Sequence, residues 1–359
     1  MAHSSTPPQS VTLLTPGADL LLQAHRSFNR ILRDLALSRD AQAIFVSLID
    51  TVETLFPGRT ASLLLLSADG LHLQVAHAPG LPDFYNQAVE SLTIGPDVGS
   101  CGAAAYWQRP VIADDVHQHP NWKAYRQLVD QVGFRACWSV PILSSTGLTL
   151  GTFAIYSHQP AMPSQLELEI LDTAASVASV AIEKFRIEQE LHWAAEHDPL
   201  TRLLNRAEVM RRIEHWVESA WLNVRPFTLL FLDLDGFKAF NDQAGHAAGD
   251  TLLTCVGKLL KQHFPEAIIG RYGGDEFLLA IPAQADFEQQ LRDWYQAFLQ
   301  QADELAPGIA LGASVGAVKV KDMVHLDALI NQADQAMYHA KESGKAQLCY
   351  SDGHCSPLS

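Results

Sequence analysis

The sequence of 359 residues is poor in cysteine, lacks a long apolar run and has fewer basic than acidic side chains. Its cysteines are odd in number and show no metal-type spacing, so we expect reduced thiols at Cys101, Cys137, Cys255, Cys349 and Cys355. No stretch approaches the ~18 uninterrupted apolar residues of a membrane span. The N-terminus also lacks a basic segment followed by an apolar one. These absences predict a cytoplasmic chain with no membrane partner.

The charge balance limits the classes of partner. Lys and Arg number 25 against 40 Asp and Glu, and the formal net charge is −15. This argues against a non-specific nucleic-acid binder, which needs a basic face. Small anionic substrates stay possible, because a metal ion and a few lysines can offset the field locally. The length and the apolar content of 48% predict two domains with a core each.

The first half of the chain predicts helices followed by a sheet. Residues 1–16 are rich in Ser, Thr and Pro and predict a disordered tail. From Ala61 onward, alternation with period two replaces the earlier helical spacing. We expect helices at 18–37 and 40–55, strands at 62–66 and 71–75 around an Asp69-Gly70 turn, a helical segment at 122–132, and strands at 110–113, 136–143 and 149–156.

Two short segments within this pattern carry a family resemblance. With Gly99-Ser100-Cys101-Gly102 and Cys137-Trp138-Ser139-Val140-Pro141-Ile142, the first half resembles a GAF domain, a small α+β sensor fold, which we assign to 17–163. The resemblance implies a small-molecule or other signal that the sequence does not identify. Cys101 and Cys137 favour a buried structural role, because free cysteine is among the most buried residue types.

A long helix over 164–197 is expected between the domains. Ser164 and Glu167 form a capping box at its start. A heptad stripe predicts a parallel coiled coil and a homodimer, through Leu166, Ile170, Thr173, Val177, Val180, Lys184, Ile187 and Leu191. A second apolar face can pack on the first domain, through Leu171, Ala174, Ala178, Ile182 and Phe185. The alternative is a single amphipathic helix that lies on its own domain.

The segment Arg271-Tyr272-Gly273-Gly274-Asp275-Glu276-Phe277 is the strongest functional signal. Its glycines permit a turn with φ > 0, and the carboxylates of Asp275 and Glu276 stand at the tip between two apolar segments. Asp233 ends another apolar strand, at 228–232. Carboxylates that converge from separate strands offer hard oxygen ligands to Mg²⁺.

Together with 198–206, 231–250 and 333–341, this segment resembles the ordered motifs of GGDEF domains, the diguanylate cyclases that join two GTP into cyclic di-GMP. The resemblance implies an α+β domain over 198–351 with a ferredoxin-like, nucleotide-cyclase-like βαββαβ core, and a tail at 352–359. Singly, each motif has a plainer interpretation: a solvated strand end, a hairpin, or lysines at a helix C-terminus.

The resemblance also implies roles for individual residues. The metal ligands are Asp233, the carbonyl of Leu234, Asp275 and Glu276, with Mg²⁺ as the metal and Mn²⁺ as a substitute. Asp275 is the candidate general base, with Glu276 and Lys238 beside it. The substrate is bound by Gly273, Gly274, Asn241, His246, Asp250, Lys341 and Lys345. A carboxylate at Asp250 pairs with two donors of guanine, which favours GTP over ATP.

This sequence departs from the family pattern at three places. Arg202 replaces a glycine of the opening motif, and Lys345 stands where arginine is usual. Residues 264–267 replace the R-x-x-D product-inhibition site, so we expect no feedback binding of cyclic di-GMP there. The expected function is a GAF-regulated diguanylate cyclase. The alternatives are a silent GGDEF module that binds GTP or cyclic di-GMP as a receptor, and adenylate cyclase-like chemistry on a similar fold.

Overall fold

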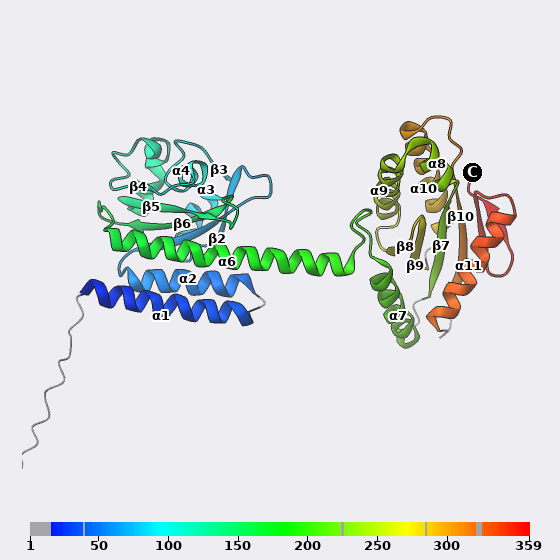
Figure 1. Ribbon diagram of the computed structural model, residues 1–359, viewed down its shortest axis with the longest axis horizontal. Coiled ribbons are helices and arrows are strands. Elements are labelled where there is room, and N and C mark those ends of the chain that lie inside the picture. The colour runs from blue at the N-terminus through cyan, green and yellow to red at the C-terminus, as the bar shows by residue number, and fades with distance from the viewer. Residues whose placement is uncertain (1–15, 39, 224–225, 284–285, 321–324) are drawn as a thin grey trace, which may run out of the picture. The chain divides into compact units, whose positions relative to one another are not determined.

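The computed structural model describes residues 16–38, 40–223, 226–283, 286–320 and 325–359. The chain divides into two compact units, Met1–Gln189 and Glu190–Ser359 (Figure 1). The tail predicted at 1–16 lies outside the described residues except for Pro16, where the first helix begins. Among the described helices, none is both long and apolar enough to cross a membrane.

The described strands of the N-terminal unit form one antiparallel sheet in the order β3-β2-β1-β6-β5-β4. Their bounds confirm the strands predicted from the alternation of apolar residues. The hairpin forms as expected, because the Asp69 carboxylate accepts from the Leu71 N–H in the turn. The strands are β1 (Thr60–Leu66), β2 (His72–His77), β3 (Leu92–Thr93), β4 (Val111–Ala113), β5 (Ala136–Leu143) and β6 (Thr149–Ser157).

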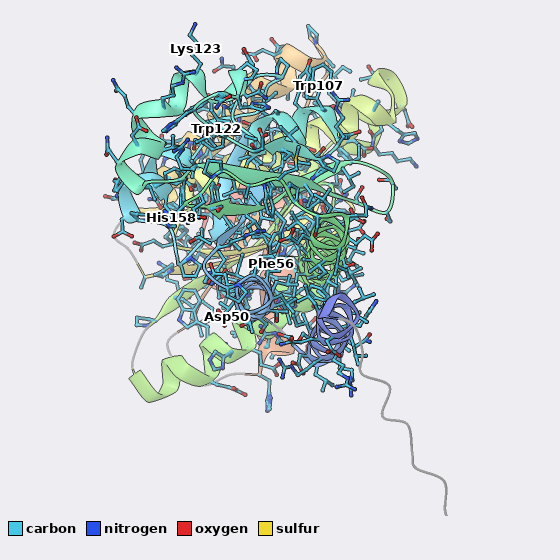
Figure 2. All side chains as sticks on the ribbon, turned by 90° about the vertical axis from the view of Figure 1, so that its left-hand side faces the viewer. Asp50, Phe56, Trp107, Trp122, Lys123 and His158 are labelled. Atoms are coloured by element: carbon cyan, nitrogen blue, oxygen red, sulfur yellow. A yellow bond between two sulfur atoms is a disulfide. The ribbon has the colours of Figure 1, made fainter. Side chains whose placement is uncertain are left out.

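Helices cover both faces of this sheet. Along β5, Trp138 packs in a core with α1 (Pro16–Leu37), α2 (Ala41–Leu55) and α6 (Gln165–Glu196). Cys137, one residue earlier, packs in the core of the opposite face. Figure 2 shows Trp122 on that face and Phe56 on the side of α1 and α2. The opposite face is covered by α3 (Asp83–Val89), α4 (Cys101–Trp107), η1 (Pro120–Tyr125) and α5 (Arg126–Val132).

The long helix α6 begins at the predicted capping box. The Ser164 N–H donates to Glu167 Oε2 at 2.7 Å, and the Glu167 N–H donates to Ser164 Oγ at 3.3 Å. The predicted second face is confirmed, since these residues are buried in the N-terminal core: Leu171, Ala174, Ala178, Ile182 and Phe185.

The heptad stripe of α6 is only partly free for a partner. Ile170 and Val177, predicted to face a second helix, are buried in the same core. Val180, Ile187 and Leu191 are 50%, 54% and 64% exposed. The prediction of one continuous outer stripe is therefore wrong. A straight helix of 3.6 residues per turn drifts against a repeat of 3.5, so the first part of the stripe turns toward the domain.

The C-terminal unit has a second sheet, in the order β12-β11-β10-β7-β9-β8. Within it β10 and β11 are parallel and the other pairs antiparallel. The predicted α+β class is confirmed, and the chain order from β7 to β10 gives a βαββαβ core. The strands are β7 (Phe227–Asp235), β8 (Ile268–Gly273), β9 (Glu276–Pro282), β10 (Gly312–Val320), β11 (Gln347–Tyr350) and β12 (Cys355–Pro357).

Helices again lie on both faces. One core joins the sheet to α8 (Phe237–Ala244), α9 (His246–His263) and α10 (Phe287–Leu305). The other joins it to α7 (Arg206–Asn223) and α11 (Leu326–Glu342). Alternate residues of β7 enter the two cores, Leu230 and Leu232 the first and Leu229 and Phe231 the second. A strand that is buried on both faces needs this continuous apolar sequence.

The C-terminal end of the chain differs from the prediction in two respects. Cys349 and Cys355 are not reduced but form a disulfide between directly opposed residues of β11 and β12. Residues 352–359, predicted as a tail, include β12, and Leu358 is buried in the core. The reason is tertiary: the pairing depends on strand register, which the spacing of the cysteines does not reveal.

Candidate active site

Acidic groups meet at one end of β7. In the antiparallel register, Asp233 of β7 lies opposite Glu276 of β9. The Leu234 N–H donates to the Asp275 carbonyl at 3.3 Å. The structure therefore brings together the four residues that the resemblance implies as metal ligands, from two strands and the turn that joins β8 to β9.

The Gly-Gly turn is held by an arginine. Of its two glycines, only Gly274 has a positive φ, of 51°. Arg271 donates from Nε and Nη2 to the Gly274 carbonyl at 2.9 and 2.8 Å. Its Nη1 donates to both carboxylate oxygens of Asp198 at 3.2 Å. This planar fork fixes the turn that presents Asp275.

The electrostatics of the site follow from burial and crowding. Burial raises the pKa of Asp275, and the negative charge of Asp233 raises it further. Burial, Asp233 and Asp275 also raise the pKa of Glu276. Lys341 of α11 lies at 2.7 Å, Nζ to Oδ1, from Asp233 and opposes these shifts. The site is rich in negative charge that Lys341 and Arg271 offset only in part, and a divalent ion would relieve the repulsion.

The donor set fits Mg²⁺ by its chemistry, because it consists of carboxylates and a backbone carbonyl. The geometry is not that of a closed metal cage. The described part of the chain contains no group of three or more His, Cys, Asp and Glu side chains poised to hold a metal ion. One oxygen of Asp233 is instead paired with Lys341. The metal ligands thus stay a prediction.

Asn241 has a buried, unpaired acceptor between α8 and α9. It lies on α8, and its Oδ1 is buried without a hydrogen-bond partner in the described parts of the chain. The glycine at position 249 of α9 leaves room for the Asn241 oxygen, since a Cβ at that position would lie 1.8 Å from it. His246 and Asp250 are exposed on α9. A ligand donor could satisfy the Asn241 oxygen, whose desolvation is otherwise costly.

Two further lysines are exposed at the ends of helices. Lys238 lies in the first turn of α8, after Gly236 with φ 85°. Lys345 follows α11 with φ 67°, and its N–H donates to the Ala340 carbonyl. A positive φ is unusual for a residue with a side chain, so the backbone around Lys345 is held by its neighbours.

The interactions that hold this backbone were not foreseen. Asp235 is buried, and its carboxylate accepts from the Ser314 hydroxyl at 2.8 and 3.0 Å and from the Ala346 N–H at 3.3 Å. Asp235 thereby positions the segment that carries Lys345. In the sequence, the position of Asp235 two residues after Asp233 could have indicated a role at the site. For Arg271, the corresponding feature is its position at the start of the segment 271–277.

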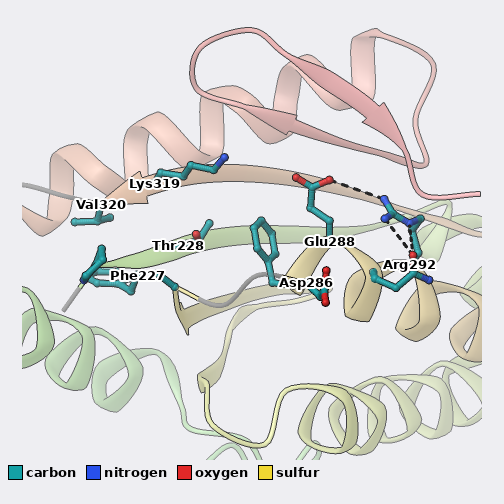
Figure 3. Close-up of a pocket in the computed structure, with 11 residues that line it drawn as sticks. Phe227, Thr228, Asp286, Glu288, Arg292, Lys319 and Val320 are labelled. Carbon is teal, nitrogen blue, oxygen red and sulfur yellow. Dashed lines mark hydrogen bonds and ion pairs between the residues drawn. The ribbon is translucent and has the colours of Figure 1, made fainter.

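A cavity of about 630 Å³ lies elsewhere on the C-terminal unit (Figure 3). It is lined by the start of β7, the start of α10 and the end of β10, far along β7 from Asp233. Three of its charged side chains have partners: Arg292 pairs with Glu288, Glu288 accepts from the Tyr350 hydroxyl, and Lys319 lies over the Tyr350 ring. It is separate from the candidate active site.

Two α+β units, the second with carboxylates gathered beside a Gly-Gly turn, define a two-domain protein with an acidic site in its C-terminal domain. Comparison with known families agrees with this division. Residues 38–183 match the GAF domain, and residues 195–347 match the family described as diguanylate cyclase, GGDEF domain. The chain is a GAF–GGDEF protein, and its C-terminal domain belongs to the diguanylate cyclase family.

Curated proteins are similar to more than half of this chain. The bifunctional diguanylate cyclase/cyclic di-GMP phosphodiesterase MucR of Pseudomonas aeruginosa is 35% identical over 207 residues, 56% of this chain and 29% of MucR. An uncharacterised protein of Mycobacterium tuberculosis is 30% identical over 239 residues, 63% of this chain and 37% of that protein. The chain thus spans well under half the length of these curated relatives.

A solved structure of a microbial GGDEF domain with cyclic di-GMP is 35% identical, with a TM-score of 0.40, and covers 45% of this chain and 99% of that one.

Proposed function

We propose that the protein is a Mg²⁺-dependent diguanylate cyclase that condenses two GTP into cyclic di-GMP and pyrophosphate. The observation that carries the proposal is the register of β7 and β9. This register sets Asp233 opposite Glu276 and beside Asp275. Lys341 forms an ion pair with Asp233, and the domain belongs to the diguanylate cyclase family.

Bound Mg²⁺ would offset the charge of the triphosphate and make the attacking hydroxyl more acidic. Asp233, the Leu234 carbonyl, Asp275 and Glu276 are the groups that would hold it, and Mn²⁺ suits the same oxygens. Asp275 takes up the proton of the ribose 3′-hydroxyl, for which a raised pKa is suited.

The backbone of the Gly-Gly turn and three lysines bind the phosphates of GTP. The exposed turn at Gly273 and Gly274 leaves room for a phosphate to lie against the backbone. Lys341 approaches from α11, and Lys238 and Lys345 lie exposed on neighbouring elements. Each lysine acts as a point charge that stabilises the leaving pyrophosphate.

Residues of α8 and α9 recognise the guanine base. The amide of Asn241 binds guanine at O6 or N3, and the carboxylate of Asp250 accepts from the N1–H and N2–H donors. His246 lies in the first turn of α9, in the same segment. Adenine lacks this pair of donors, which favours GTP and argues against adenylate cyclase-like chemistry.

Two copies of the chain are needed, because each GGDEF domain holds one GTP and the reaction joins two. We place the dimer contact on the exposed part of α6, at Val180, Ile187 and Leu191. A signal at the GAF domain regulates how the two half-sites approach each other. The reaction takes place in the cytoplasm, where GTP is available.

The competing function is a silent GGDEF module that binds GTP or cyclic di-GMP as a receptor. A silent module has no need of the crowded carboxylates, whose mutual repulsion is unfavourable without a cation. Asp233, Asp275 and Glu276 are all present and adjacent. This retained arrangement favours the enzyme.

Turnover of GTP by the purified full chain with Mg²⁺ tests the proposal. Wild type should form cyclic di-GMP, identified by chromatography, and Asp275→Asn should lose at least about 100-fold in rate, as expected for a lost general base. Asp293→Asn, an exposed carboxylate on α10, is the matched control and should stay active. GTP binding without turnover in wild type would support the receptor instead.

A further inference from the structure

The Cys349–Cys355 disulfide holds an edge strand of the C-terminal sheet. Strand β12 lies at one edge of the described sheet and pairs with β11. The two cysteines face each other across this pair, and the bond encloses the turn that joins the two strands. Cys349 is fully buried, whereas Cys355 is partly exposed. The bond thus fixes an edge strand of only three residues.

Leu358 follows β12 and connects it to the backbone beside the candidate active site. Its side chain is buried in the core, and its N–H donates to the Ala346 carbonyl at 3.0 Å. The Ala346 N–H donates in turn to Asp235 Oδ2 at 3.3 Å. Asp235 ends β7, two residues after Asp233. Two hydrogen bonds therefore lead from the strand that the disulfide fixes to the acidic end of β7.

The backbone along this path is strained. Lys345 and Ala346 have φ of 67° and 49°, in the left-handed region that residues with a Cβ seldom adopt. Such a conformation persists only where the surrounding structure fixes it. Ala346 is fixed by its N–H on Asp235 and by the Leu358 N–H on its carbonyl. Loss of the Leu358 contact would let the segment 345–346 relax, and the Lys345 side chain would move with it.

We propose that Cys349 and Cys355 form a reversible redox-modification site. Its disulfide state fixes the backbone of Lys345 and Ala346 through Leu358, and its dithiol state releases that backbone. Lys345 is one of the lysines that we propose to bind phosphate, so the oxidised form binds GTP more tightly than the reduced form. This consequence for GTP rests on the proposed function, whereas the redox site itself does not.

The reduction is an ordinary thiol–disulfide exchange. A thiolate of a dithiol reductant attacks the sulfur of the partly exposed Cys355, the S–S bond breaks, and Cys349 leaves as a thiolate that takes up a proton. The second thiol of the reductant, as a thiolate, attacks the reductant sulfur of the mixed disulfide. Cys355 leaves and takes up a proton, and the reductant becomes a disulfide. Two electrons and two protons pass to the protein, and oxidised glutathione reverses both steps.

A purely structural disulfide explains these facts less well. A disulfide that stabilises a domain by restraining the unfolded chain gains most from a long loop, whereas this bond joins residues six positions apart. The bond also lies at a sheet edge and includes a partly exposed cysteine, where a reductant can reach it. In the cytoplasm, where we place the proposed reaction, disulfides are usually transient and redox-sensing.

Hydrogen exchange of the full chain in oxidised and reduced dithiothreitol tests the site, with the cysteines followed by alkylation and mass mapping. We expect the disulfide to be reduced in the folded protein and to re-form in the oxidised reagent. The amides of Ala346 and Leu358 should exchange at least about tenfold faster in the reduced form. The proposal is overturned by free Cys349 and Cys355 under oxidising conditions, by a bond that only denatured protein loses, or by unchanged exchange after reduction.

Two variants separate the bond from general effects of the reductant. Cys355→Ser removes the bond at its partly exposed end, so both amides should exchange at the fast rate with or without reductant. Cys255→Ser, which changes a free cysteine on α9, is the matched control and should keep the difference between the two states. If folded Cys355→Ser exchanges as slowly as the oxidised wild type, β12 does not depend on the bond and the proposal is wrong.

GTP binding distinguishes a failure of this proposal from a failure of the proposed function. Calorimetry should show about tenfold weaker GTP binding in the reduced protein, the size of one lost contact to a charged group. In Lys345→Ala this difference between the two states should vanish. Absence of GTP binding in both states would contradict the proposed function, while the exchange rates still decide the redox site. Equal GTP affinity in two states with different exchange rates would overturn the proposed effect on GTP.

Discussion

Arg271 joins Asp198 to the Gly-Gly turn, because one terminal nitrogen binds the Asp198 carboxylate and the other two nitrogens bind the Gly274 carbonyl. Asp198 stands two residues after the end of α6, and its carboxylate also accepts from the N–H and hydroxyl of Thr201. The start of the C-terminal domain is thus fastened to the turn that presents Asp275 by a short path of hydrogen bonds.

Replacement of this arginine tests the path. Arg271→Lys keeps the charge but loses the planar fork, so it cannot hold Asp198 and Gly274 together. We expect a loss of about 1.5–3 kcal/mol in the free energy of unfolding, from hydrogen bonds to a charged group. We also expect a larger fall in kcat than in GTP affinity, measured by denaturant unfolding and steady-state turnover. Arg292→Lys on α10 is the matched control; an equal effect there would contradict the assigned role.

The pH dependence of stability should depend partly on Glu208. Arg211 and then Arg212 hold the pKa of this carboxyl at about 2, below its usual 4.5. A lowered folded-state pKa stabilises the domain above pH ~4.5, and this stabilisation is lost as pH falls toward 2. Glu208→Gln should therefore be less stable than wild type at pH 7, with the difference shrinking toward pH 2. Melting temperatures of both proteins from pH 2 to 7 measure this, and a constant difference would contradict it.

Gly249→Ala should impair the predicted guanine site. The new Cβ would lie 1.8 Å from Asn241 Oδ1, so the amide must leave its position. We expect weaker GTP binding by calorimetry, and a destabilisation of about 1–3 kcal/mol for an overpacked contact. Gly17→Ala is the matched control, because its Cβ would meet Leu166 at an ordinary 3.5 Å. Unchanged GTP affinity in a folded Gly249→Ala protein would remove Asn241 from the site.

The periodicity of apolar residues was sufficient to predict most of the fold. Strand β5 was predicted at 136–143 and has those bounds, because its side chains alternate between two cores. The outer stripe of α6 was partly wrong, since Ile170 and Val177 are buried. A heptad count gives the spacing of residues but not the rotation of the helix about its own axis against the sheet.

For the candidate active site, the order of the sequence motifs predicted which residues come together but not the contacts that hold them in place. Asp233 and the Gly-Gly turn come together through strand register, as expected from two apolar strands. The contact of Arg271 with Gly274 and the burial of Asn241 Oδ1 depend on side-chain conformations that no spacing encodes. The Cys349–Cys355 disulfide was missed because it depends on the register of β11 and β12, which the spacing of the cysteines does not reveal. The catalytic and metal-binding roles remain predictions.

The exposed part of α6 should carry self-association. Ile187 and Leu191 lie four residues apart, and apolar side chains that are 54% and 64% exposed favour burial against a second helix. Ile187→Glu with Leu191→Glu should raise the dimer dissociation constant at least tenfold, about 1.4 kcal/mol, in sedimentation velocity. Leu148→Glu, in the turn between β5 and β6 and 66% exposed, is the matched control. On the proposal that each domain holds one GTP, the α6 variant should also lose cyclic di-GMP synthesis at low protein concentration and regain it as concentration rises. A dimer that persists in this variant would place the contact on another surface.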